Sequence, residues 1–213
     1  VLDSLNIDQR EAVGAPSGNM LVLAGAGSGK TRVLVHRIAW YIETDHTSPH
    51  SIMAVTFTNK AAAEMRIRIE KLLGQSIRGM WVGTFHSLAH RLLRTHWQEA
   101  GLPQDFQIID SKDQFRMIRR LIRTTTIDES QYSPREAQWY INARKDEGLR
   151  PEHIDAHGDA SIAQMVQIYK SYQDACERSG LIDFAELLLR SFELFREQDA
   201  VRKHYQHRFK HVL

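Results

Sequence analysis

The chain has 213 residues, of which 42% are hydrophobic and 25% are charged, proportions that are ordinary for a globular protein. Its formal net charge is only +2, so binding to a polyanion has to be argued from local patches. No apolar run approaches the roughly 20 residues that span a bilayer, no secretory signal opens the sequence, and Cys176 is the only cysteine. We therefore expect a cytoplasmic protein with no membrane partner and no internal disulfide.

Residues 1–86 alternate strand-like and helix-like segments, which is typical of βαβ units and a parallel sheet. Apolar runs predict strands over residues 20–24, 52–57 and 80–84. Helical spacing predicts one helix between the first two strands and another between the last two, ending near Gly74. The residues expected to face inward from these helices are Val33, Leu34, Ile38, Tyr41, Ile42, Ala62, Met65, Ile69 and Leu72.

From about residue 87 the pattern becomes helical, and residues 209–213 then indicate the start of another strand. We therefore predict an α/β fold whose parallel sheet is truncated and is interrupted by an inserted all-helical subdomain. The helices are predicted over residues 91–100, 111–124, 134–148 and 161–179 and after Asp183. The predicted boundaries are 1–86 for the α/β domain, 87–207 for the helical insertion and 208–213 for the returning strand.

A run of small residues followed by Lys-Thr lies between the predicted strand at 20–24 and the helix after it. The spacing matches a Walker A phosphate loop, except that Ala24 stands where the strict pattern has Gly. Small residues let the backbone N–H groups point at phosphate oxygens, and the following helix adds its positive end. We expect Lys30 to reach the β and γ phosphates and the Thr31 hydroxyl to ligate Mg²⁺. The loop consists of Ala24, Gly25, Ala26, Gly27, Ser28, Gly29, Lys30 and Thr31.

Polar and aromatic side chains follow the second and third predicted strands. The first group is Thr56, Phe57, Thr58 and Asn59, and the second is Thr84, Phe85, His86 and Ser87, of which Phe85 and His86 are the candidates for DNA contact. An aromatic face can stack on a nucleic-acid base, so two such groups at strand ends suit a track for a single strand. The alternative is that the polar residues cap helices and the aromatic residues belong to the core.

A phosphate loop alone leaves kinases, GTPases, transporters and motors possible. Four segments in order narrow this choice, because together they resemble the motifs of superfamily-one DNA helicases of the UvrD/Rep/PcrA family. The likeness continues through three further segments and covers essentially the whole chain. The four motif segments are residues 6–13, 24–31, 55–65 and 81–89, and the further ones are 107–110, 145–149 and 181–187.

This resemblance implies a RecA-like P-loop NTPase domain that uses ATP and Mg²⁺. It implies that Gln9, whose amide can both donate to and accept from an adenine edge, reads the base, and that Arg32 lies on the nucleotide side. It makes Lys30 and Thr31 the catalytic residues of the loop and assigns the two strand-end groups to single-stranded DNA. The implied activity is ATP-driven, three-prime to five-prime DNA translocation and unwinding. The implied partners are single strands, single-strand/duplex junctions and proteins of excision and mismatch repair.

The family's acidic motif, which holds Mg²⁺ and positions the attacking water, is expected immediately after Leu213. We therefore expect an N-terminal fragment that binds ATP weakly and does not turn it over. Two alternatives stay open, namely another P-loop ATPase such as a small-molecule kinase, and a DNA-binding module without catalysis.

The predicted helix over residues 111–124 is two-sided. Phe115, Ile118, Leu121 and Ile122 fall on one face, and Arg116, Arg119, Arg120 and Arg123 fall on the opposite one. The arginine face can contact duplex phosphates, or it can be an ordinary solvated face.

Further along, Asp183 and Glu186 have the spacing of a capping box, which favours a structural role over a catalytic pair.

Overall fold

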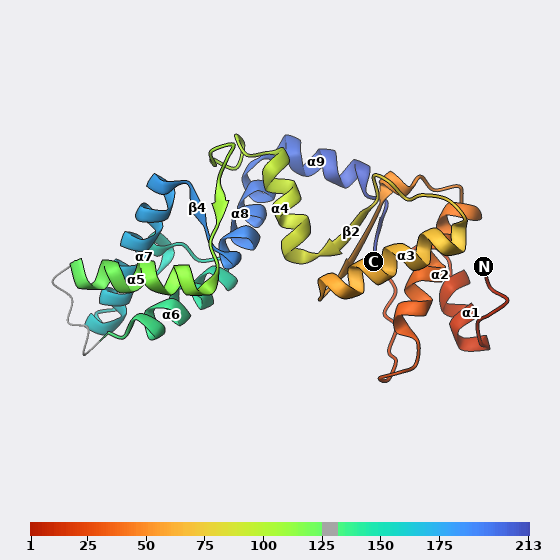
Figure 1. Ribbon diagram of the computed structural model, residues 1–213, viewed down its shortest axis with the longest axis horizontal. Helices are drawn as coiled ribbons and strands as arrows, with labels where there is room; N and C mark the ends of the chain where they lie inside the picture. Colours follow the sequence, from red (N-terminus) through yellow and green to blue (C-terminus); the bar gives the residue numbers. More distant parts are fainter. Residues whose placement is uncertain (125–131) are drawn as a thin grey trace. The chain divides into compact units, whose positions relative to one another are not determined.

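The computed structural model describes residues 1–124 and 132–213, which form two compact units (Figure 1). The first unit comprises Val1–Leu88 and Lys203–Leu213, and the second comprises Ala89–Arg202. Among these described residues, none of the helices combines the length and the apolar composition needed to cross a bilayer.

The first unit is built on a parallel sheet with the strand order β2 (Trp81–Thr84), β1 (Ile52–Thr56) and β5 (His211–Val212). The parallel sheet predicted for this part of the chain is thus confirmed. Helix α2 (Lys30–Glu43) and helix α3 (Asn59–Leu73) supply the apolar faces that pack on it. The unit also contains helix α1 (Ile7–Gly14), the 3₁₀ helix η1 (Pro49–Ser51), the start of α4 (Phe85–Thr95) and the end of α9 (Asp199–Arg208).

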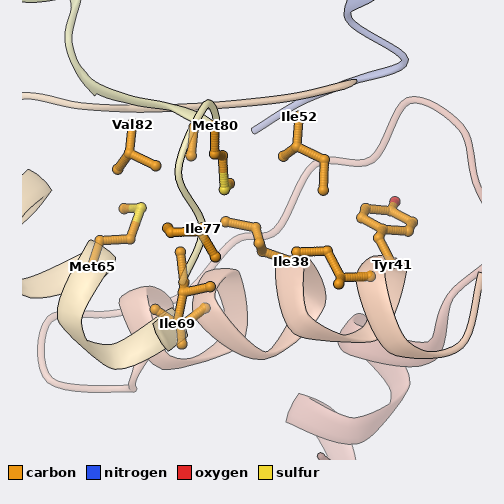
Figure 2. Packing of buried hydrophobic residues seen from close by; sticks show 11 residues of the cluster. Ile38, Tyr41, Ile52, Met65, Ile69, Ile77, Met80 and Val82 are labelled. Carbon is orange, nitrogen blue, oxygen red and sulfur yellow. The ribbon is translucent and has the colours of Figure 1, made fainter. Parts of the chain in front are cut away.

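The core of the first unit lies between the sheet and these two helices, as Figure 2 shows. Ile38 and Tyr41 come from α2, Met65 and Ile69 from α3, and Ile52 from the central strand, and all five are at most 4% exposed. The inward residues predicted from helical spacing are buried or half-buried in the structure. Burial of this apolar surface, at about 25 cal/mol per Å², is the main force that holds α2 and α3 on the sheet.

The strand predicted over residues 20–24 is absent from this described part of the chain, so that prediction is wrong. Leu21 and Leu23 are more than 80% exposed, and Met20 and Val22 are about 40% exposed. A strand needs a neighbour with free backbone groups, and the edge strand β5 offers only two residues on its side away from β1. An apolar run can satisfy a strand pattern and still lack the partner that would make it a strand.

The second unit is a helical assembly. Its core draws on α5 (Ser111–Thr124), α6 (Pro134–Asp146) and α7 (Ala160–Ser179), with α8 (Phe184–Glu197) packed against α6. The bounds predicted for α5 are confirmed, and Gly180 ends α7 at a φ of 62° as a C-terminal cap. The largest fully buried side chains of this core are Ile118, Ile122, Ile141, Ile168, Tyr169 and Tyr172.

The second unit is not all-helical, which corrects the prediction. Strands β3 (Gln107–Ile108) and β4 (Leu181–Ile182) form a short parallel pair, and η2 (Pro151–His153) adds a 3₁₀ turn. Each strand leads into a helix whose first turn is capped by an aspartate, Asp110 before α5 and Asp183 before α8. The pair therefore aligns the starts of two helices, which a search for helical spacing does not detect.

Several helix bounds also differ from expectation, and helix α6 ends at Asp146 rather than at residue 148. Helix α4 begins at Phe85 rather than at residue 91, and it ends at Thr95 before the turn to Gly101. Helix α9 was not predicted as a separate element.

Charged side chains form a buried cluster in the second unit. Lys145 Nζ lies 2.7 Å from Asp183 Oδ2 and 2.9 Å from Glu186 Oε2, and Arg150 pairs with both Glu186 and Glu193. Burial alone would raise the pKa of Glu186, but Lys145, Arg150 and Arg190 outweigh it and hold that pKa well below its ordinary value. These contacts agree with the structural role predicted for Asp183 and Glu186, because both carboxylates are buried in ion pairs.

Candidate nucleotide site and nucleic-acid interface

The Gly-rich loop is folded over the N-terminal end of α2. Lys30 is the first residue of that helix, and its Nζ donates to the carbonyl oxygens of Ala24 and Gly25 at 3.1 and 2.8 Å. Ser28 Oγ donates to the Gly25 carbonyl at 2.7 Å, which closes the loop. Lys30 and Thr31 are exposed at its mouth, so the ammonium can exchange carbonyl partners for phosphate oxygens.

Gln9 lies against this loop. Its Nε2 donates to the Ser28 carbonyl at 3.1 Å, and its Oε1 accepts from the Asn6 backbone N–H at 3.3 Å, which completes a capping box at the start of α1. A side-chain amide has two donor hydrogens and two acceptor lone pairs, so one of each remains for an adenine edge. Arg32 Nη2 donates to the Ser4 carbonyl at 2.6 Å, which keeps that side chain beside the same N-terminal segment.

A cavity of about 740 Å³ adjoins the loop within the first unit. Its lining includes Lys30 and Thr31 from α2, Thr56 from the end of β1, and the residues around β5. A Cβ added at Gly25 or Gly27 would meet nothing within 4 Å, so the loop is open around these glycines. An ammonium, a hydroxyl and a helix N-terminus are the groups that bind the phosphates of a nucleoside triphosphate and its metal ion. The residues present here therefore fit those phosphates.

The metal expectation concerns Thr31 alone. The described residues contain no group of three or more His, Cys, Asp or Glu side chains placed to hold a metal ion. Mg²⁺ characteristically binds through one or two protein oxygens plus the phosphates of its nucleotide, and the exposed Thr31 hydroxyl can supply one of those oxygens.

The two strand-end groups meet at one edge of the sheet. Thr56 and Thr84 are register partners at the ends of β1 and β2, so Phe57 and Phe85 follow neighbouring strands. Their ring centroids are 6.4 Å apart with an interplanar angle of 57°. Phe57 is 91% exposed and Phe85 is 55% exposed, so neither is a core aromatic residue.

The polar members of these groups divide between capping and the exposed edge. Thr58 Oγ1 accepts from the Ala61 N–H and caps α3, as the structural alternative predicts. Asn59 Oδ1 accepts a hydrogen bond from the Thr84 hydroxyl at 3.5 Å, which links the two strand ends. His86 is half-buried in the first turn of α4.

The sequence matches the UvrD/REP helicase N-terminal domain over residues 5–213. The chain belongs to this family. It is 62% identical over all 213 residues to DNA helicase II of Salmonella typhimurium and of Escherichia coli, and 38% identical to ATP-dependent DNA helicase PcrA of Staphylococcus epidermidis. These matches include the whole of this chain, which spans only about 30% of the length of each relative.

The UvrD/REP helicase family agrees with the mixed fold of helices and a small parallel sheet, and it confirms the resemblance described above. Within this helicase domain, the predicted nucleotide residues gather around the loop, and the predicted DNA residues gather at the ends of β1 and β2. Thr56 belongs to both surroundings, because it lines the cavity and directly precedes Phe57.

Thr84 belongs to the second polar-aromatic group that the sequence indicates, but only the register of β1 with β2 reveals that it joins the strand ends. One further residue of the site, Arg37, was not found from the sequence. Arg37 is 4% exposed and also lines the cavity. Its position on the face of α2 that carries the apolar residues could have indicated a buried arginine.

Proposed function

We propose that this chain is the ATP-binding part of an ATP-dependent DNA helicase. The observation that carries the proposal is the continuity of two surfaces at Thr56. One side of this residue is the cavity beside Lys30 and Thr31, and the next residue, Phe57, begins the exposed aromatic pair. A motor needs such continuity, because loss of the γ phosphate has to change how tightly the protein binds the DNA strand.

The nucleotide part of the proposal assigns ATP to the loop from Ala24 to Thr31. Lys30 holds the β and γ phosphates, Thr31 contributes its hydroxyl to Mg²⁺, Gln9 reads adenine and Arg32 lies on the nucleotide side. Bound Mg²⁺ neutralises charge that develops on the phosphates. Since the 213 residues contain no matching acidic motif, we propose that this chain alone does not hydrolyse ATP.

The nucleic-acid part of the proposal places a single strand along the ends of β1 and β2. Bases stack on Phe57 and Phe85, and stacking of this kind contributes about 1–3 kcal/mol per base. Thr56, Thr58, Asn59 and His86 are the polar residues at this edge that we assign to the strand.

The wider biology of the proposal rests on the family. We infer three-prime to five-prime movement, action at single-strand/duplex junctions, and a role in excision and mismatch repair with its partner proteins. We infer likewise that residues 1–86 and 208–213 form a RecA-like domain and that 87–207 is its helical insertion. The single buried thiol, Cys176, fits the reducing conditions of the cytoplasm.

The test is ATP turnover by the complete parent protein with and without single-stranded DNA. We expect strong stimulation by DNA, and we expect Lys30→Ala to abolish turnover in both conditions. Phe57→Ala combined with Phe85→Ala should raise the DNA concentration for half-maximal stimulation by roughly tenfold or more. Turnover that is indifferent to DNA would instead assign the chain to a general P-loop ATPase.

A further inference from the structure

The guanidinium of Arg37 is buried beneath the C-terminal end of α1. Its Nη1 donates to the carbonyl oxygens of Ala12, Val13 and Ala15 at 2.9–3.0 Å, and its Nη2 donates to that of Pro16 at 3.3 Å. The last carbonyls of a helix have no partners within the helix, so one side chain here satisfies several of them. A cation at this end also interacts favourably with the helix dipole.

Helix α1 depends on such anchors because it has only eight residues. Isolated helices shorter than about 12 residues are marginal in water, so docking rather than propensity determines where this one lies. Its single buried residue, Val13, packs with Leu5 and with Val33 of α2. The N-terminal end is held by the capping box of Asn6 and Gln9, and the C-terminal end is held by Arg37.

Arg37 and the phosphate-binding residues belong to the same helix, α2. Lys30 and Thr31 form the first turn of α2, and Arg37 lies two turns later on the same helix. Gln9 is carried by α1 and touches the loop through the Ser28 carbonyl. The position of Gln9 relative to the phosphates is therefore set through α2, by way of the contact of Arg37 with the end of α1.

We propose that Arg37 is a positioning residue for base recognition, acting through Gln9. This inference rests on the proposed function, since it requires ATP in the loop with its adenine beside Gln9. Adenine presents an amino donor and a ring-nitrogen acceptor to the free positions of the Gln9 amide. Hypoxanthine presents a carbonyl oxygen in place of the amino group, so the preference for ATP over ITP measures how well Gln9 is placed.

The experiment compares kcat/KM for ATP and for ITP in the complete parent protein at saturating single-stranded DNA. Arg37→Met should lower the ATP/ITP ratio by up to about tenfold, mainly through the KM for ATP, because one hydrogen bond to the base is lost. Gln9→Ala should lower the ATP/ITP ratio to the same value as Arg37→Met does. In a protein that already carries Gln9→Ala, adding Arg37→Met should not change the ratio further. Arg37→Lys should restore part of the preference, because an ammonium can still donate to these carbonyls.

Arg94→Met is the matched control for a purely structural loss. Arg94 also donates to two carbonyl oxygens, those of Gln104 and Phe106, but it lies in the second unit. It should lower thermal stability and leave the ATP/ITP ratio unchanged. If Arg37→Met lowered kcat/KM for both nucleotides equally, Arg37 would be a scaffold residue and the inference would be overturned.

Two further outcomes separate this inference from the proposed function. A parent protein that turns over neither nucleotide contradicts the proposed function itself. A parent protein that turns over ATP and ITP equally well, with DNA stimulation, leaves the DNA-stimulated motor standing but contradicts the reading of adenine by Gln9, and the inference with it. If Arg37→Met does not fold, the test uses Arg37→Lys instead. An Arg37→Lys protein whose KM changes for both nucleotides while its ATP/ITP ratio stays that of the wild type also overturns the inference.

Discussion

Gly29 meets two demands at the junction of the loop with α2. Its φ of 89° lies in the left-handed region, and a Cβ on it would lie 2.9 Å from Gln9 Nε2. The left-handed conformation costs a residue other than glycine about 1–2 kcal/mol. The absence of a side chain here thus allows both the turn of the loop and the approach of the base-reading amide.

Gly29→Ala should therefore destabilise the nucleotide-free protein by about 1–2 kcal/mol, because the left-handed backbone is strained, and it should push the Gln9 amide away from the loop. The measurement is the thermal unfolding of the first unit without nucleotide. Gly25→Ala is the control, because Gly25 has no positive φ and no atom within 4 Å of an added Cβ. Equal melting temperatures for the two variants would contradict this account.

At the residue scale, the sequence predicts side chains whose role depends on near neighbours. Lys30 and Thr31 follow from the spacing of the loop itself. Arg37 does not, because its partners are backbone carbonyls more than twenty positions away, and any arginine has the same donors. The same reason hides the pairing of Lys145 with Asp183 across 38 positions.

Helix α5 has the two faces that the sequence predicts. Ile118 and Ile122 are completely buried, while Arg116, Arg119, Arg120 and Arg123 are exposed. Arg116 also pairs with Asp113, but both side chains are more than half exposed, so water and salt screen that interaction. The four arginine side chains therefore lie on the exposed face of α5, and binding of this face to duplex phosphates is a prediction to be tested.

Replacing the four arginines of α5 with glutamine in the complete parent protein should weaken duplex binding. It should also reduce the slope of log K against log salt by about 0.9 for each phosphate that the variant no longer neutralises. Lys170→Gln with Arg178→Gln is the control, since these exposed cations lie on α7. An unchanged slope for the α5 variant would show that its arginines form only a solvated face.

Elements differ in how far the sequence specifies them. Helix α5 was predicted with its observed bounds from apolar spacing, and in the structure Asp110 caps its first turn. The run at 20–24 was predicted as a strand on apolar character alone, and strand pairing depends on a partner from elsewhere in the chain. The short pair β3–β4 was missed for the converse reason, since two residues are too few to show alternation.

Across the whole molecule, the two units differ in how their buried charges are compensated. In the first unit, backbone carbonyl oxygens satisfy the buried Arg37, and the cluster beneath the sheet is apolar. The second unit combines an apolar cluster with the buried charges of Lys145, Asp183 and Glu186. Buried ion pairs add little stability compared with apolar packing, but losing one partner leaves an uncompensated charge, which is strongly destabilising.

Glu186→Gln should therefore lower the local stability of α6 and α8 by about 3–5 kcal/mol at pH 7. The pKa of Glu186 is depressed in the folded state, so its contribution is fully present above the unfolded pKa of about 4.3 and is lost as pH falls toward the lower folded value. The difference between wild type and variant should narrow below about pH 4. Amide hydrogen exchange measures it, and a constant difference from pH 7 to pH 3 would contradict the argument.

Four charges in this cluster pair with more than one opposite charge, namely Lys145, Arg150, Glu186 and Arg190. Glu186 contacts three cations, Lys145, Arg150 and Arg190, and Arg150 in turn is shared with Glu193. A mutation that changes the sign or removes the charge at one position leaves its neighbours unmatched, so a single step away from this arrangement is disfavoured. Evolutionary drift at these positions should therefore proceed through concerted exchanges, and homologues that differ at one of them should differ at its partners as well.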